Sequence, residues 1–124
     1  MDVDLANYKR EWRKKNKDKV RISQDKYYKK NKHLVLFKDY VRRDKNKNLE
    51  NDLTLEWLEN NIFNKSCIYC GRKINIGCDR KDNNLGHTKD NVMPCCWDCN
   101  RIRGDMFSID QMILIGKFLY ENIY

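Results

Sequence analysis

Two pairs of cysteines have the spacing of metal ligands. Cys67 and Cys70 are separated by two residues and are followed by Gly71. Cys96 and Cys99 repeat this spacing later in the chain. One such turn presents two thiolates to the same ion, and two turns complete the tetrahedral four-cysteine set that Zn²⁺ prefers. The sequence therefore predicts a structural zinc site that cross-links two distant segments of the chain.

Two further cysteines compete with this assignment. Cys95 adjoins Cys96, but only Cys96 has the two-residue spacing to Cys99. Cys78 lies in a stretch that alternates in polarity like a strand, where a thiol packs as a small apolar side chain. We therefore expect Cys78 to be a core residue. The alternative for the four paired cysteines is a redox pair or free thiols.

Length and composition require such a cross-link. The chain has 124 residues, of which 35% are charged and 40% hydrophobic. This composition cannot build a large core, and small domains with a weak core usually rely on metals or disulfides. The sequence contains no apolar run of about 18 residues that could span a membrane. Because the start of the chain lacks the features of a signal peptide, we expect a cytoplasmic protein with reduced thiols.

Positive charge is concentrated in the first part of the chain. The formal net charge is +8, yet residues 1–48 carry 17 basic and 7 acidic residues, whereas residues 49–124 carry 9 and 11. A basic segment joined to a near-neutral domain is typical of nucleic-acid binding. We therefore expect residues 1–48 to form a basic helical DNA-binding arm. The alternative is a helix whose lysines simply face water.

A 15-residue repeat runs through this arm. The segments 12–17 and 27–32 share a basic pattern that ends in Asn-Lys, and the segment 42–47 is a fainter copy. No glycine or proline lies between residues 1 and 70, so long helices are allowed. Fifteen residues make about four helical turns, which would place successive clusters on one side of a continuous helix. The lysines predicted to bind DNA are Lys14, Lys15, Lys17, Lys29, Lys30 and Lys32.

Short elements are expected around the cysteines. The segment between the two pairs predicts a strand that ends near Asp79, a polar loop and a second strand near residues 91–93. A helix should follow the second pair and end at Gly104. Further helices are expected over residues 33–41 and 54–62 and after Ser108, where Gln111 completes a capping box. The predicted fold class is therefore α+β, a mostly helical chain around a small zinc-stapled core.

The predicted C-terminal helix has an apolar face that would pack on this core. Its members are Ile109, Met112, Ile113, Phe118 and Leu119.

Over roughly residues 66–120 the sequence resembles the HNH endonucleases, the ββα-metal or His-Me finger nucleases, in their zinc-bearing branch. Asp79-Arg80 stands where that family usually has Asp-His, Asn91 at its central Asn, and Asn100 at its last His. The pattern is closest to PacI-type restriction enzymes and to HNH proteins of phages. The resemblance implies an HNH nuclease domain over residues 49–124. It also implies that Asp79 and Asn100 bind a catalytic Mg²⁺ or another divalent metal, for which oxygen ligands are suited.

Arg80 departs from the usual family pattern. Arginine stays protonated, so Arg80 can hold a phosphate but cannot remove a proton from water. Another residue must then activate the nucleophile, and the two candidates are Tyr69, within the first cysteine turn, and His87, in the loop. Asn91 would hold the loop against the strand. Arg101 and Arg103 would contact phosphates from the helix after the second cysteine pair.

The resemblance implies a metal-dependent endonuclease that hydrolyses double-stranded DNA to 5′-phosphate and 3′-hydroxyl ends. Cutting both strands symmetrically would require a homodimer. A role in restriction, homing or phage DNA processing is left open, and the Lys-, Asn- and Ile-rich composition suggests an AT-rich phage or viral genome. One alternative is a catalytically inactive zinc-ribbon DNA-binding protein derived from the HNH fold. Another is a basic helical protein that binds RNA or acts as a scaffold.

Overall fold

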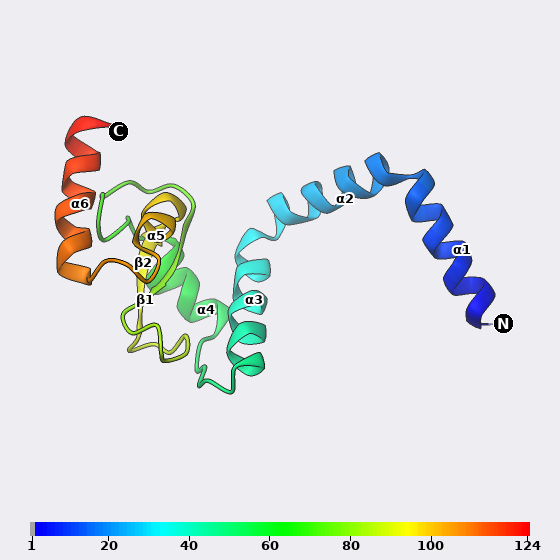
Figure 1. Ribbon diagram of the computed structural model, residues 1–124, viewed down its shortest axis with the longest axis horizontal. Helices are drawn as coiled ribbons and strands as arrows, with labels where there is room; N and C mark the ends of the chain where they lie inside the picture. Colours follow the sequence, from blue (N-terminus) through cyan, green and yellow to red (C-terminus); the bar gives the residue numbers. More distant parts are fainter. Residues whose placement is uncertain (1) are drawn as a thin grey trace. The chain divides into compact units, whose positions relative to one another are not determined.

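The computed structural model describes residues 2–124, with side chains from residue 4 onward, and the chain divides into two compact units after Val35 (Figure 1). The first unit contains α1 (Asp2–Lys15), α2 (Lys17–Lys30) and the start of α3 (Lys32–Asn46). The second contains the rest of α3, α4 (Leu55–Leu58), the π-helical turn η1 (Glu59–Phe63), β1 (Ile76–Arg80), β2 (Val92–Cys96), α5 (Trp97–Arg103) and α6 (Ile109–Asn122). The predicted α+β class is confirmed.

The repeat does not form one continuous helix, so that prediction is wrong. The helix is interrupted at Asn16, with φ −119° and ψ 32°, and again at Asn31, with φ −118° and ψ 29°. The Asn16 side-chain amide donates to the carbonyl of Trp12 at 2.7 Å, and that of Asn31 donates to Tyr27 at 3.1 Å. Asparagine side chains compete in this way for backbone groups and interrupt helices. The repeat therefore sets the length of each helix.

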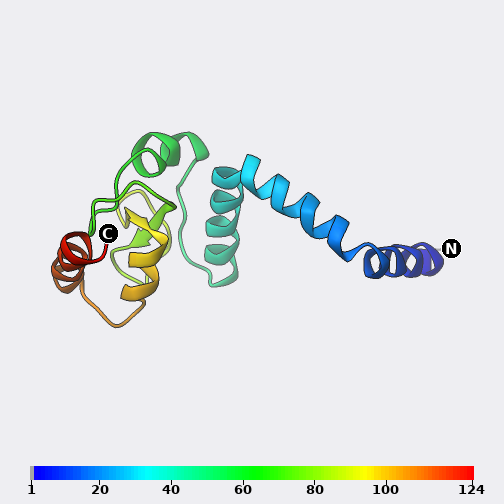
Figure 2. The same cartoon turned by 90° about the horizontal axis from the view of Figure 1, so that it is seen from above.

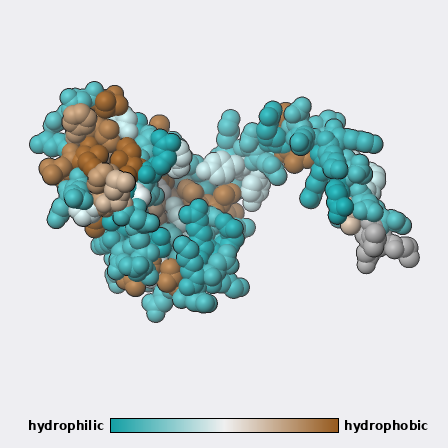
Figure 3. Space-filling view, in the orientation of Figure 1, coloured by the Kyte–Doolittle hydropathy of each residue, from teal (hydrophilic) through white to brown (hydrophobic). Residues whose placement is uncertain are grey.

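The first unit contributes nothing to a core, because none of its described side chains is buried. The surface of α1 and α2 is almost entirely hydrophilic in Figure 3. Among residues 2–124, no helix is long and apolar enough to cross a membrane.

A two-stranded antiparallel sheet forms the centre of the second unit. Ile76 pairs with Cys96 at one end of the sheet and Arg80 pairs with Val92 at the other. Helix α5 begins directly after β2 and packs on both strands, as the views in Figures 1 and 2 agree. The largest fully buried apolar side chains around the sheet are Leu58, Ile62 and Met112. This order of strand, loop, strand and helix is the one predicted between the cysteine pairs.

The second half of α3 belongs to this core. Tyr40 is 7% exposed, and its hydroxyl accepts a hydrogen bond from the Cys78 amide in β1 at 3.0 Å. Asp44, one turn further on, is 1% exposed. The compact unit therefore begins at Leu36, whereas the charge distribution places the boundary after residue 48. Charge marks where basic residues stop, but burial begins earlier, because α3 carries both basic and core residues.

The helices of the second unit begin and end close to the residues that the sequence predicts. The Thr54 side chain accepts from the Trp57 amide and caps α4, and the predicted 54–62 helix continues as η1. Gly104 ends α5 with φ 46°, a conformation that favours glycine. Ser108 and Gln111 form the predicted capping box at the start of α6.

Only part of the predicted apolar face of α6 is buried. Met112 is fully buried and Ile109 and Leu119 pack against the core. The expected packing is wrong for Ile113 and Phe118, which are 45% and 59% exposed. Apolar side chains accordingly gather on the surface over α6 in Figure 3. The helix has more apolar residues than the small core can cover.

Gly116 allows α6 to lie against the first cysteine turn, and a larger residue there should be destabilising. A Cβ atom at this position would lie 2.4 Å from the carbonyl carbon and oxygen of Tyr69. Because the clash is with backbone atoms that cannot rotate away, the cost should lie near the upper end of the about 1–3 kcal/mol of overpacking, above the about 1 kcal/mol by which alanine favours helices over glycine. We expect Gly116→Ala to lower Tm by at least about 4 °C, measured by thermal unfolding. Lys117→Ala, at an exposed neighbour, should leave Tm nearly unchanged; equal Tm values would contradict this packing.

Candidate functional site

Four buried cysteines converge between the first turn and the start of α5. Their sulfur atoms all lie within 4.8 Å of one another: Cys67, Cys70, Cys96 and Cys99. The sulfurs of Cys70 and Cys96 are 3.7 Å apart. Zn–S bonds of about 2.3 Å in a tetrahedron place sulfurs about 3.8 Å apart. The donor set and spacing therefore fit a tetrahedral metal such as zinc.

The backbone shapes the first turn around this cluster. The Gly71 amide donates to the Cys67 carbonyl at 2.9 Å, and Gly71 has φ 78°, which favours glycine. The Ile68 amide donates to the Pro94 carbonyl at 2.9 Å, tying the turn to β2. The loop that carries Cys67 and Cys70 is thus attached to the segment that carries the other pair.

The other two cysteines are not among these four, although the side chain of Cys95 hydrogen-bonds to that of Cys67. The Cys95 thiol donates to the carbonyl of Cys96 at 3.3 Å. Cys78 is buried in β1, as expected for a core residue, and burial raises the pKa of its thiol to about 12. Cys78 is therefore a neutral packing residue.

The Asp79 carboxylate is the centre of a buried polar group next to this cluster. Asp79 is 3% exposed. The Tyr69 hydroxyl donates to its Oδ2 at 2.5 Å, and Nη1 of Arg103 lies 2.8 Å from both carboxylate oxygens. The first cysteine turn, β1 and α5 each contribute one of these three side chains. The segments that carry the four cysteines therefore also position the acidic residue.

Arg103 does not have the expected surface position. Besides its ion pair with Asp79, its guanidinium donates to the carbonyls of Arg80 at 2.7 Å and Phe107 at 3.1 Å. Arg103 is only 5% exposed. A phosphate-contacting role for this side chain is therefore corrected to that of an internal partner of Asp79, because the buried carboxylate requires a cation. Arg101, which is exposed, stacks on the Trp97 ring at 4.6 Å.

The environment of Tyr69 keeps its phenol protonated. Burial raises the pKa of Tyr69, and the hydrogen bond that it donates to the Asp79 carboxylate raises the pKa further. A phenol in this state is a proton donor to Asp79. Tyr69 can therefore hold and orient a proton at Oδ2 of Asp79.

Asn100 lies on α5, one turn before Arg103. Its side-chain amide donates to the Cys78 carbonyl at 3.3 Å, beside Asp79. Residues three apart share a helix face, so Asn100 and Arg103 both face the end of β1. Asn100 is exposed, whereas Arg103 is buried. The structure thus brings the predicted strand-end Asp79 and helix residue Asn100 to neighbouring positions.

His87 belongs to a second buried group. Its Nδ1 lies 3.0 Å from Oδ1 of Asp44, its amide donates to Oδ2 of Asp44 at 2.8 Å, and its ring stacks on Tyr40 at 4.6 Å. Burial lowers the pKa of His87, against the opposing effect of Asp44. Burial would raise the pKa of Asp44, but hydrogen bonds from His87 and Asn51 outweigh it and the pKa falls. His87 is therefore hydrogen-bonded to Asp44, whereas Tyr69 is hydrogen-bonded to Asp79, so the two candidate bases belong to separate buried groups.

Asn91 holds the loop between the strands, as its predicted role requires. Its amide nitrogen donates to the carbonyls of Asp82 at 3.0 Å and Gly86 at 2.9 Å, and its oxygen accepts from the Asp82 amide at 3.0 Å. The Arg80 guanidinium, at the end of β1, donates to the Leu85 carbonyl at 3.1 Å. Loop residues 82–86 are therefore held against the strand ends.

Sequence reasoning gives Arg103 a different role and does not identify Asp44. Arg103 lies three residues after Asn100, so their shared helix face could have placed it beside Asp79. Asp44 occupies the repeat position that holds Lys14 and Lys29 in the earlier copies. An acidic residue at a basic repeat position was a signal of a different role, although its partner could not be identified, because His87 lies 43 residues away.

Comparison with known proteins places the chain beside a viral protein and a nuclease structure. No family model matches the chain. Protein R423 of Acanthamoeba polyphaga mimivirus, which is uncharacterized, is 32% identical over 106 residues. That match covers 76% of this chain, which spans about a fifth of the viral protein. The solved structure of the rare-cutting HNH restriction endonuclease PacI matches with a TM-score of 0.61 at 22% identity, over 73% of this chain and 78% of that one. The chain therefore shares the fold of an HNH restriction endonuclease.

Proposed function

We propose that this protein is a zinc-stapled, divalent-metal-dependent HNH endonuclease that hydrolyses double-stranded DNA to 5′-phosphate and 3′-hydroxyl ends. The observation that carries the proposal is the position of Asp79 at the end of β1 next to Asn100 of α5, with Tyr69 of the first cysteine turn hydrogen-bonded to Asp79. The fold shared with PacI supports it.

In this proposal the four cysteines hold Zn²⁺, whose role is structural. Asp79 and Asn100 hold Mg²⁺ or another divalent ion. An ionised carboxylate has about four lone-pair positions, and Arg103 and Tyr69 direct three contacts to Asp79. The remaining capacity, with an amide oxygen, fits a magnesium ion that keeps most of its waters and binds substrate phosphate. Such an ion, when bound, supplies Lewis-acid stabilisation of the phosphate and the leaving oxygen.

The protein's own side chains would position the reacting groups. Arg103 pairs with Asp79 and fixes the orientation of its carboxylate. Arg80, half-exposed at the end of β1, would hold a phosphate oxygen and stabilise charge that develops there. Tyr69 would position the attacking water, or accept its proton at the hydroxyl oxygen while passing its own proton to Oδ2 of Asp79. His87, oriented by Asp44, is the second candidate base, and Asn91 keeps the loop between them and the strands in place.

The arm would supply binding strength that does not depend on DNA sequence. The side chains predicted to contact DNA are accessible to it. Lys32 is partly exposed, and the others are exposed: Lys14, Lys15, Lys17, Lys29, Lys30 and Arg101. Cutting both strands symmetrically would need a homodimer. The mimivirus relative supports a viral or phage origin, and a cytoplasmic location remains part of this proposal.

A second candidate function is a zinc-containing DNA-binding protein without catalysis. The ion pair between Asp79 and Arg103 favours it, because a carboxylate already neutralised by a buried guanidinium attracts a second cation more weakly. The two proposals differ in one respect: the first requires strand cleavage with a divalent metal, and the second excludes it.

The metal content distinguishes Cys96 from its neighbour. We expect one zinc ion per chain in the purified protein, and we expect Cys96→Ser to lose both the zinc and most of the cooperative unfolding transition, because structural zinc binding contributes directly to folding. Cys95→Ser is the matched control and should keep a full zinc equivalent. Elemental analysis with thermal unfolding measures both. Loss of zinc in the Cys95 variant but not in the Cys96 variant would refute the ligand set.

Cleavage tests the enzyme proposal directly. Incubation of supercoiled plasmid with the protein and Mg²⁺ or Mn²⁺ should yield nicked or linear DNA. Asn100→Ala should reduce the rate at least about 100-fold if a catalytic metal ligand is lost, whereas Ile102→Ala, on an exposed part of the same helix, should cleave normally. Intact plasmid with the wild-type protein under every divalent ion would leave the DNA-binding alternative.

The residue that activates the nucleophile can be identified by two substitutions. We expect Tyr69→Phe to lower the cleavage rate by about 100-fold, the lower range for general acid–base groups. We expect His87→Ala to reduce it in proportion to lost folded protein only, since the His87 pairing fixes the loop. Gel-based rates corrected for the folded fraction at the assay temperature measure this. Normal cleavage by the Tyr69 variant with a large loss in the His87 variant would reverse the assignment.

A further inference from the structure

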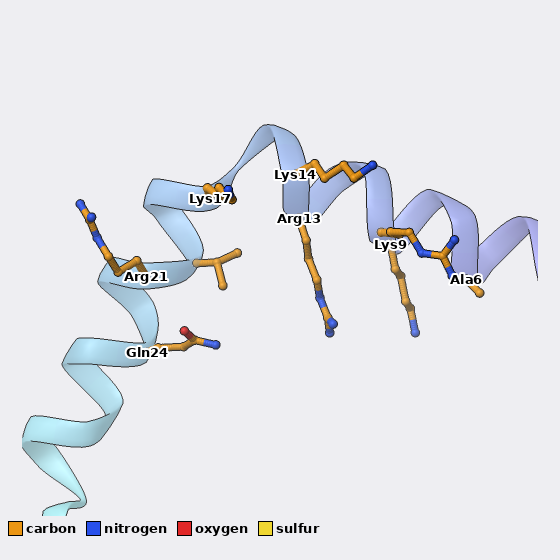
Figure 4. Close-up of a pocket in the computed structure, with 9 residues that line it drawn as sticks. Ala6, Lys9, Arg13, Lys14, Lys17, Arg21 and Gln24 are labelled. Atoms are coloured by element: carbon orange, nitrogen blue, oxygen red, sulfur yellow. The ribbon is translucent and has the colours of Figure 1, made fainter.

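The bend between α1 and α2 forms a groove from one face of each helix. Ala6, Lys9, Arg10, Arg13 and Lys14 contribute from α1, at positions three or four apart, and Lys17, Val20, Arg21 and Gln24 contribute from α2 with the same spacing. Residues three and four apart lie on one helix face. Figure 4 shows Lys9 and Arg13 leaving α1 in the same direction, with Gln24 directed into the space between the helices.

Charge separates this face from the rest of the two helices. Six of the nine lining residues are lysine or arginine, and none is acidic. The carboxylates of Glu11 and Asp18 lie outside it, 3.9 Å from Lys14 and 3.8 Å from Arg21. These exposed pairs are weak, so both cations remain available to a polyanion. Basic residues that are spread evenly along the sequence of the arm are therefore gathered on one surface, the groove.

We propose that this groove, defined by the nine residues above, binds the phosphate backbone of duplex DNA. The proposal rests on the proposed function for its choice of polyanion and names the face of the arm that makes the contacts. Phosphates are regularly spaced single charges, and a lysine or arginine that neutralises one of them releases counterions. Six cations around an open groove, with an amide from Gln24, provide ligands for several consecutive phosphates.

The opposite face supplies the matched comparison. Lys19 lies two residues after Lys17, about half a turn around α2, and Lys26 has the same relation to Gln24. Both are exposed, and neither lines the groove. If only the net charge of the arm determined DNA binding, every exposed lysine would contribute equally to it. The groove predicts that Lys19 and Lys26 contribute little.

Binding of a short mixed-sequence duplex to the full chain tests this, by fluorescence anisotropy between about 50 and 200 mM salt without added divalent ions. We expect Lys9→Gln with Arg13→Gln to reduce the slope of log K against log salt by about 2, at about 0.9 per phosphate contact. Lys19→Gln with Lys26→Gln removes the same charge and should change the slope by less than about 0.5. Circular dichroism checks that both doubles keep wild-type helix content.

Equal slope changes in the two double variants would overturn the groove, because charge alone would then account for binding. Tighter binding of single-stranded RNA than of duplex DNA, lost in the groove variant, would overturn the choice of duplex DNA. The test does not depend on cleavage. A wild-type protein that never cuts plasmid but shows the groove-specific slope would refute the proposed enzyme and support this surface, and the opposite pair of results would do the reverse.

Discussion

The convergence of four thiols from two distant segments is the constraint on which the rest of the folded unit depends. A core of this size has few large apolar side chains, and several of its fully buried residues are the cysteines themselves. Joining the turn at residues 67–70 to the start of α5 places Tyr69 against β1 and fixes α5 across the sheet. Besides that link, hydrogen bonds from the Ile68 amide to Pro94 and from the Tyr69 hydroxyl to Asp79 hold this turn against the sheet.

The buried group around Asp79 follows from this link and carries a cost. A carboxylate that is 3% exposed must be paired, and Arg103 and Tyr69 pair it from the two segments that the cysteines join. Removing one partner of a buried ion pair typically costs about 3–5 kcal/mol. Asp79 is thus both a structural and a candidate chemical residue, so the effect of substituting it would mix unfolding with lost function. Asn100 is exposed on the face of α5 that also carries Arg103, so substituting Asn100 separates lost function from unfolding.

Much of the second unit could be predicted from the sequence, because its signals are local. The cysteine spacing, the Ser108 capping box and the polar loop between strands each depend on neighbouring residues. The buried pair of Asp44 and His87 could not be predicted, since it depends on how α3 meets a loop 43 residues further along. The inward position of Arg103 was missed for another reason: a basic residue near a proposed DNA site was assigned to phosphate, although a buried carboxylate lay within reach of the same helix face.

The repeat shows how one 15-residue unit can serve two purposes. In its first two copies the side chains of Asn16 and Asn31 interrupt the helix, and α3 ends at Asn46 in the third. In that third copy Asp44 replaces the lysine of the earlier copies and is buried against His87. The three helices therefore keep a similar length. In α1 and α2 this repeat position carries an exposed lysine suited to a polyanion, whereas in α3 it carries a buried residue that belongs to the core. The arm and the folded unit consequently share α3.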